Sequence, residues 1–374
     1  MKNQLKTYLW ALIPILFLLS CSDDDPAPTT LEGKIQQYLE QKQSPDQPGL
    51  SISVRKDNEI VYEGSKGLAR MSINQSINAE TQFRIGSISK PITALAIMQL
   101  VESGELSLDD KLLSFYPELS SNFEHITISH LLSHRSGLLD YIEDNTNVLA
   151  LDDLDIQDAL AFIRDPNSGF ENLEFEPGTM GRYSNTGYVL LALIIEKVTG
   201  MTLPAYLSQH IFEPAGMNST FVISEDEHLG DHGDNYALSL GTNINVLGFN
   251  SLIYGASGVV STTSDMMLFV EALLNGEFVT AETLMMMTQT QGTVPNIETD
   301  YGLGWLTGTG NHWHTGYITD QNDFWHSGGF DGYQTVLSIN PDLNLEMIIL
   351  SNGGNDTKQK MWDLLELARN HYRE

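Results

Sequence analysis

Apolar positions follow two different periods along this chain, and the two patterns occupy different regions. Strand-like alternation or short apolar runs occur near both ends, whereas helical spacing dominates the middle. The strand-like stretches are 49–55, 60–63, 301–305, 324–327, 333–340 and 343–350. The helical stretches are 31–43, 92–101, 128–133, 156–163, 188–198, 266–274 and 361–371. This order predicts an α+β fold: one antiparallel sheet built from both terminal regions, flanked by terminal helices, with a mostly helical insertion at about 90–295.

The beginning of the chain has the organisation of an export signal. Lys2 and Lys6 give it a positive start, and residues 8–19 form an apolar stretch too short to span a bilayer comfortably as a helix. The letters L-L-S-C at 18–21 resemble a bacterial lipoprotein processing box. The resemblance implies a lipoprotein signal peptide at 1–20, cleavage before Cys21 and acylation of that cysteine. An ordinary signal peptide with an incidental cysteine is the alternative.

Residues 21–30 read as a flexible linker with two prolines and two threonines, ahead of one domain at 31–374. An acidic run at 23–25 resembles the signal that sends some Gram-negative lipoproteins to the cell surface, and it suits a solvated tether equally well. We therefore expect an exported protein, attached to the membrane of the bacterial cell envelope through a lipid. Cys21 is the only cysteine, so no intramolecular disulfide can form.

Composition and charge limit the classes of molecule that this chain can bind. The chain has 374 residues, of which 41% are hydrophobic, enough for a large core. Its formal net charge is −30, from 49 acids against 19 bases. So acidic a chain repels nucleic acid and anionic membrane surfaces, which argues against nucleic-acid binding. The acids are spread along the chain, as expected of a solvated surface.

The most informative chemical signal is S-I-S-K at 87–90, which an apolar helical run follows. A serine hydroxyl is a poor nucleophile until a base takes its proton. Ser87 and Lys90 are three residues apart, so at the beginning of a helix they share one face and the amine can reach the hydroxyl. The first helical turn also leaves backbone N–H groups free for a developing oxyanion. The pair predicts a nucleophile beside an activating amine.

A second segment, Y-S-N at 183–185, lies in a predicted loop that precedes an apolar helix. A tyrosine phenol is a weak base unless a nearby cation stabilises its anion, and the Lys90 ammonium could do so. The amide of Asn185 offers a donor and an acceptor to a substrate amide. The segment therefore supplies a candidate base, Tyr183, and a candidate substrate clamp.

A third segment, H-S-G-G at 326–329, lies at the end of a predicted strand. Glycines there let a substrate backbone approach as if adding a strand. The N–H of Gly329 is a candidate second oxyanion donor beside that of Ser87. By itself, His326 would be read as a half-exposed strand histidine.

Together and in this order, the three segments resemble the motifs of the serine β-lactamase-like and D-Ala-D-Ala carboxypeptidase family, the penicillin-recognising serine hydrolases of the class C β-lactamase type. Members carry S-x-x-K, then Y-x-N, then K-T-G or H-x-G at the end of a strand. Stretches at 126–138, 175–178, 258–262 and 301–305 are similar to further landmarks of the family. The resemblance covers about 31–370 and implies a β-lactamase/transpeptidase-like fold.

The resemblance implies a role for each matching residue. Ser87 would be the acylated nucleophile, Lys90 and Tyr183 would move its proton, and either could be the acylation base. Asn185, His326, Ser327 and Gly328 would bind substrate, and the N–H groups of Ser87 and Gly329 would form the oxyanion hole. His326 stands where many relatives have lysine and is only fractionally charged near neutral pH, which fits peptidases and esterases better than a true β-lactamase.

The expected function is therefore a serine hydrolase that forms an acyl-enzyme on a peptide or ester substrate. A D-Ala-D-Ala carboxypeptidase or D-amino-acid peptide hydrolase acting on peptidoglycan precursors is favoured. An esterase or weak β-lactamase of the same family shares every motif. A rival of another class is a non-catalytic surface binding module, against which the presence of Ser87, Lys90 and Tyr183 together argues.

No cofactor or metal is expected. His312 and His314 alternate on a strand-like stretch, but no carboxylate or cysteine stands at an obvious ligand spacing, and a surface loop is the better interpretation. His228 and His232 are four apart, but the glycine between them and their polar flanks favour a loop. The methionines at 266–267 and 285–287 read as core residues of helices.

Overall fold

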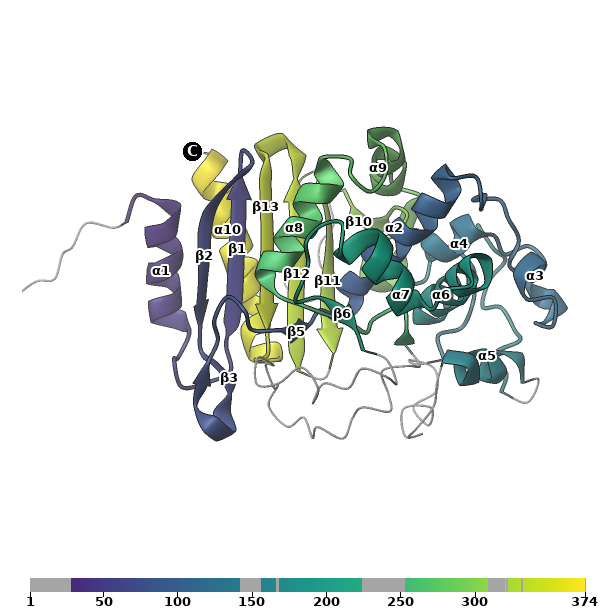
Figure 1. Cartoon of the computed structure of the whole chain (residues 1–374), viewed down its shortest axis with the longest axis horizontal. Coiled ribbons are helices and arrows are strands. Elements are labelled where there is room, and N and C mark those ends of the chain that lie inside the picture. The colour runs from purple at the N-terminus through teal and green to yellow at the C-terminus, as the bar shows by residue number, and fades with distance from the viewer. Residues whose placement is uncertain are drawn as a thin grey trace, which may run out of the picture.

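The structure, a computed structural model, describes residues 28–141, 156–165, 168–223, 253–308, 320, 322–330 and 332–373. Its main feature is an antiparallel sheet in the order β2-β1-β13-β12-β11-β10-β9-β8, which joins strands from both ends of the chain and confirms the predicted topology (Figure 1). The strands are β1 (Leu50–Lys56), β2 (Glu59–Lys66), β8 (Gly292–Val294), β9 (Thr299–Tyr301), β10 (Leu306–Thr307), β11 (Phe324–Phe330), β12 (Tyr333–Asn340) and β13 (Leu345–Ser351).

Helices cover both faces of this sheet. On one face, α1 (Leu31–Lys42) and α10 (Asn355–Arg373) pack against each other and against the strands, with Ile35, Met361 and Trp362 buried in a shared core. On the other face lie α8 (Thr263–Leu274) and α2 (Ser89–Glu102) (Figure 1). The central strands are thus buried on both sides, which explains why β13 is apolar along most of its length.

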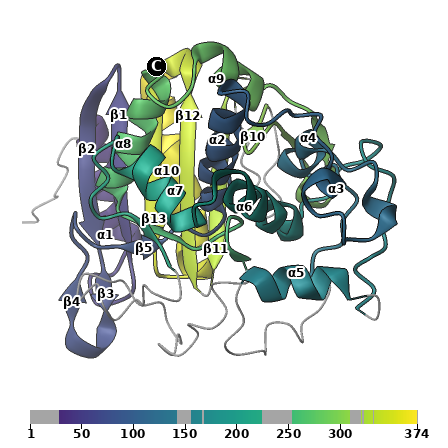
Figure 2. The ribbon, with the colours of Figure 1, turned by 45° about the vertical axis from the view of Figure 1, so that its right-hand side comes forward.

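Between the sheet-forming ends, the chain is mostly helical, as predicted. Figure 2 shows α2 standing between the sheet and α6. Both helices are buried nearly all round, so neither has the polar face of a surface helix. α6 spans Asn185–Thr199, and this part of the chain also contains α3 (Leu112–Phe115), α4 (Ile128–Leu132), α5 (Ile156–Arg164), α7 (Leu203–Leu207) and α9 (Ala281–Thr288) besides α8.

Two small sheets were not predicted. One has the order β5-β7-β6, and the other pairs β3 with β4. Their strands are two or three residues long, too short to carry a detectable period, and are fixed by their partners. They are β3 (Leu68–Arg70), β4 (Gln75–Ser76), β5 (Phe83–Arg84), β6 (Phe221–Val222) and β7 (Val259–Ser261).

Two sequence expectations are wrong. Residues 301–305 do not form one strand: β9 ends at Tyr301, and β10 begins at Leu306. Gly304 turns the chain with φ +93° against α2, where a Cβ would lie 2.3 Å from that of Ala94. Of the methionines of α9, only Met287 is buried, whereas Met285 is 70% exposed. The methionines of α8 are in the core, as expected.

Several expected features lie outside the described residues: the segment 1–20, Cys21 with most of the linker, and the histidines at 228, 232, 312 and 314. Within the described ranges, no single helix is long and apolar enough to cross a membrane, although α6 and the helical segment Leu203–Phe212, which are bent by 77° relative to each other, pass that test as a pair by length and composition. α6 is part of the buried core.

Candidate active site

Ser87 lies on a single 3₁₀ turn, Gly86–Ile88, which runs directly into α2 at Ser89. The sequence placed it in the first α-helical turn; it is in fact just before that turn. Gly86 has φ +56°, a left-handed conformation that favours glycine, and a Cβ there would lie 2.9 Å from the backbone nitrogen of Gly329. The turn that carries Ser87 therefore contacts β11 backbone to backbone.

A second close approach fixes the same contact. A Cβ on Gly328 would lie 2.1 Å from the carbonyl oxygen of Ile85, so only glycine fits there. The hydroxyl of Thr335 on β12 donates to that carbonyl at 2.7 Å. Ser87 and Gly329 line the same cavity, and Gly86, the residue before Ser87, packs against the backbone of Gly329, an arrangement compatible with an oxyanion hole.

Lys90 is fully buried, and its ammonium group faces three oxygens. Nζ lies 3.1 Å from Ser87 Oγ, 2.8 Å from Asn185 Oδ1 and 2.9 Å from the carbonyl oxygen of Ala256. An ammonium has three N–H bonds to donate, so this set of acceptors suits the charged form. The predicted serine–lysine contact is present.

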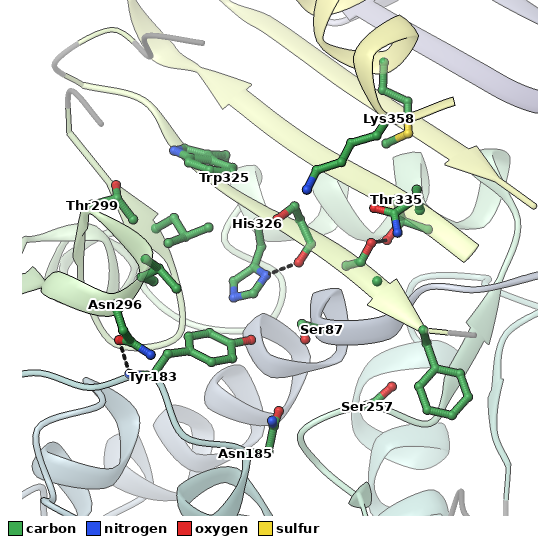
Figure 3. Close-up of a pocket in the computed structure, with 18 of the residues that line it drawn as sticks. Ser87, Tyr183, Asn185, Ser257, Asn296, Thr299, Trp325, His326, Thr335 and Lys358 are labelled. Carbon is green, nitrogen blue, oxygen red and sulfur yellow. Dashed lines mark hydrogen bonds between the residues drawn. The ribbon is translucent and has the colours of Figure 1, made fainter. Parts of the chain in front are cut away.

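The ring of Tyr183 packs against the Lys90 ammonium, and Lys90 Nζ is 4.7 Å from the centroid of that ring. Its hydroxyl points towards Ser87 (Figure 3). Hydrogen bonds fix the backbone on both sides of Tyr183. The N–H groups of residues 182–185 all donate to acceptors outside this loop. The N–H of Tyr183, for example, donates to Asn296 Oδ1 at 2.9 Å. The loop thus presents the phenol in a defined position.

Asn185 is the first residue of α6, and Asp140 fixes its orientation. One carboxylate oxygen of Asp140 accepts from the backbone N–H of Asn185 at 2.6 Å and from its side-chain amide at 2.9 Å. The amide nitrogen of Asn185 therefore faces Asp140, and its oxygen faces Lys90. Asp140 is fully buried, and sequence reasoning gave it no role.

His326 is buried, not half exposed, and both of its ring nitrogens have partners. Nδ1 lies 2.7 Å from the carbonyl oxygen of Ser327, which can only accept, so Nδ1 carries a proton. Nε2 lies 3.0 Å from the hydroxyl of Tyr301 and can accept from it. A neutral imidazole can make both contacts, with Nδ1 as the donor and Nε2 as the acceptor.

Sequence reasoning also gave no role to His134, which packs beneath Tyr183. The centroids of the two rings are 4.3 Å apart, and the backbone of His134 is left-handed, with φ 58°. Burial, followed by the positive charge of Lys90, holds its pKa well below the ordinary value of 6.5. Its only sequence signal was a place in the family-like stretch 126–138.

These residues open into a cavity of about 710 Å³. Ser87, Tyr183, Asn185 and the H-S-G-G segment at 326–329 all line it, so the structure brings every predicted substrate-binding residue to one place (Figure 3). Lys358 of α10 lines it too, a half-buried cation whose pKa is lowered by burial. In the described part of the chain, no carboxylate lines the cavity and no histidine, cysteine or carboxylate cluster could hold a metal.

Comparison with known proteins places this geometry in a family. A family model described as Beta-lactamase matches residues 31–370. The chain is 33% identical over 327 residues to a penicillin-binding protein of Bacillus subtilis, a match covering 82% of this chain and 69% of that protein. It is 34% identical over 191 residues to Esterase EstB of Burkholderia gladioli, a match covering 48% of each.

A solved structure shows the same fold. The D-amino acid amidase of Ochrobactrum anthropi SV3, complexed with L-phenylalanine, superposes with a TM-score of 0.75 over 92% of this chain and 98% of that one. The two sequences are 23% identical, so this likeness concerns the fold alone.

Proposed function

Because the chain belongs to the beta-lactamase family and its relatives include a penicillin-binding protein and an esterase, it is a hydrolase, and we propose that it acts by forming an acyl-enzyme on Ser87. The favoured substrate is a peptide ending in D-amino acids, as in D-Ala-D-Ala cell-wall precursors. The observation that carries the proposal is the buried Lys90 ammonium, which contacts Ser87 and Asn185 and lies over the ring of Tyr183.

In the acylation step, Tyr183 is the general base. The Lys90 ammonium donates to three oxygens and has no lone pair for a proton, whereas its charge stabilises a phenolate beside it. Tyr183 takes the proton of Ser87 as Oγ bonds to the substrate carbonyl carbon. The N–H groups of Ser87 and Gly329 stabilise the oxyanion. The carbon–nitrogen bond then breaks, and the leaving amine takes the proton from Tyr183.

In the deacylation step, water attacks the ester carbonyl and Tyr183 takes one of its protons. The ester bond breaks, Ser87 recovers its proton from Tyr183, and the acyl group leaves as a carboxylic acid. The same base thus serves both steps, as microscopic reversibility of an acyl transfer allows. Asn185 holds the substrate amide, with its own amide fixed by Asp140.

The strand beside Ser87 supports a peptide substrate. β10 pairs with Phe324 and Trp325 of β11, and the segment 327–329 lies beyond the end of that pairing and lines the cavity. An extended peptide could add to β11 there as a further strand. Lys358 places a positive charge at the same cavity, which suits a substrate carboxylate.

An esterase is the second candidate, because Esterase EstB matches this chain at 34% identity and an ester needs no peptide pairing. The proposal also includes location: export through the segment 1–20 and attachment to the cell envelope through acylated Cys21.

The test is a comparison of rates on four substrates: a D-Ala-D-Ala peptide, a D-amino-acid amide, a short-chain aryl ester and a chromogenic cephalosporin. We expect the highest kcat/KM on the D-Ala-D-Ala peptide. Ser87→Ala should abolish turnover of every substrate while leaving the melting temperature close to wild type, since Ser87 lines the cavity and its loss removes the nucleophile.

Turnover by Ser87→Ala would contradict the assignment of the nucleophile. A preference for the aryl ester, with no peptide cleavage, would favour the esterase. Intact-mass spectrometry after exposure to a fluorescent penicillin should give an adduct on the wild type that is missing from Ser87→Ala.

A further inference from the structure

His134 holds the backbone on both sides of Tyr183. Its carbonyl oxygen accepts from the N–H of Arg182 at 2.8 Å, and its ring nitrogen Nδ1 accepts from the N–H of Ser184 at 3.1 Å. Its ring also packs against that of Tyr183, with centroids 4.3 Å apart. One residue therefore fixes the residues before and after the candidate base and supports its ring.

These contacts require one particular form of the imidazole. Nδ1 accepts a hydrogen bond, so it carries no proton, and the neutral ring must carry its proton on Nε2. Within the described residues, Nε2 is buried with no hydrogen-bond partner, and the ring lies among those of Tyr183, Tyr188 and Tyr301. A buried polar atom without a partner costs free energy. His134 therefore carries an unsatisfied buried atom while its ring contacts Tyr183, the candidate base.

The backbone of His134 is also unusual. It follows the last residues of α4 in a left-handed conformation, φ 58°, which non-glycine residues seldom adopt. This conformation lets its carbonyl and its ring meet the same loop, at 182 and 184. Strained backbone and an unsatisfied buried atom in one residue are characteristic of functional sites, because the surrounding structure must stabilise both.

We propose that His134 is a positioning residue for the reaction at Ser87, holding the Tyr183 phenol against Lys90 through its hydrogen bond to Ser184 and its ring contact. The inference rests on the proposed function, in which Tyr183 is the base. His134 does not touch the substrate. It acts by keeping the loop 182–184 in the geometry that the proton transfer needs, and small displacements of a catalytic group reduce rates strongly.

The test compares two nearly isosteric substitutions. His134→Asn keeps an acceptor near the position of Nδ1, and asparagine tolerates the left-handed conformation. His134→Leu has a similar shape and no acceptor. With an aryl ester as substrate, we expect His134→Leu to lower kcat by about tenfold to a hundredfold with KM within about twofold, and His134→Asn to keep kcat within about threefold of wild type.

Hydrogen exchange of the segment 181–187, read by mass spectrometry, needs no turnover. We expect faster exchange there in His134→Leu and wild-type exchange in His134→Asn, because only the latter can accept from the Ser184 N–H. Thermal melting of both variants measures the general cost of the strained position.

The inference is overturned if the two variants lose kcat equally, if the loss is in KM, or if exchange in the segment is the same in both. A wild type inactive on every substrate of the panel would instead contradict the proposed function, and the exchange comparison would still decide whether His134 holds the loop.

Discussion

At the scale of single residues, the charge state of His134 links the site to the stability of the fold. Its ring is fully buried beside the Lys90 ammonium, and both burial and that charge keep it neutral. The unfolded chain offers the same imidazole to water, where it protonates with its ordinary pKa. The folded and unfolded states therefore differ in proton uptake below neutral pH.

This difference predicts a pH dependence of unfolding. As pH falls below the ordinary pKa of 6.5, the unfolded state takes up a proton at His134 that the folded state does not, so the free energy of unfolding decreases. The full contribution is present above that pH, and at pH 5.5 the loss from this residue is about 1 kcal/mol. Urea unfolding at pH 7.5 and 5.5 measures it. Between pH 7.5 and pH 5.5, the unfolding free energy of His134→Asn should decrease less than that of the wild type, by that amount. Equal decreases in the two proteins would show that His134 is protonated in the folded state.

At the scale of elements, long regular patterns were predictable and short contacts were not. β12 spans Tyr333–Asn340, the range expected from its apolar alternation, and α2 and α6 enclose their predicted apolar runs. The break at 302–305 could not be predicted, because it depends on the packing of Gly304 against α2. Likewise, the sequence suggests only that Gly328 lets a substrate backbone approach, whereas in the fold no larger residue fits at this position.

Replacing that glycine should separate the Ser87 turn from β11. In Gly328→Ala, the new methyl group would lie 2.1 Å from the Ile85 carbonyl oxygen and 2.4 Å from Thr335 Oγ1, so one element must shift. We expect a loss of about 1–3 kcal/mol in unfolding free energy and a fall of about 10²–10³ in kcat/KM, since the oxyanion donors move apart.

Chemical denaturation and aryl-ester kinetics measure both effects. Gly329→Ala is the comparison for stability, because its methyl group would meet only the end of the flexible Gln334 side chain, at 3.4 Å. If Gly328→Ala is as stable and active as wild type, the close contact is not needed for the site.

At the scale of the whole molecule, the site draws on segments spread over the chain. Ser87, Tyr183 and His326 were predictable, because their chemistry is visible in residue type and order. His134 and Asp140 were not, because they bind backbone N–H groups 50 and 45 residues further along the chain, which only the folded chain brings to them. Lys358, on the last helix, was missed for the same reason.

Lys358 gives a prediction about substrate choice. Lys358→Met keeps the apolar stem and removes the charge, so KM should rise about fivefold to tenfold for a D-peptide with a free carboxylate and stay unchanged for the same peptide as its amide. Steady-state kinetics on the pair measures this. Lys360→Met is the matched control, because Lys360 lies on the same helix and its Nζ donates a hydrogen bond to Gln43 Oε1 at 2.8 Å. Equal effects on both peptides would exclude a carboxylate contact.

The placement of β1 between β2 and β13 has a consequence for biosynthesis. Leu50 pairs with Ser351 and Lys56 with Leu345, so one side of this buried strand has no partner until nearly the whole sequence has been made. Contacts between such distant residues slow folding. Until they form, the growing polypeptide exposes an unpaired strand edge that is prone to aggregation. If the chain is exported before it folds, as proposed above, this edge stays unpaired during the transfer, and activity begins only after the last strands have docked.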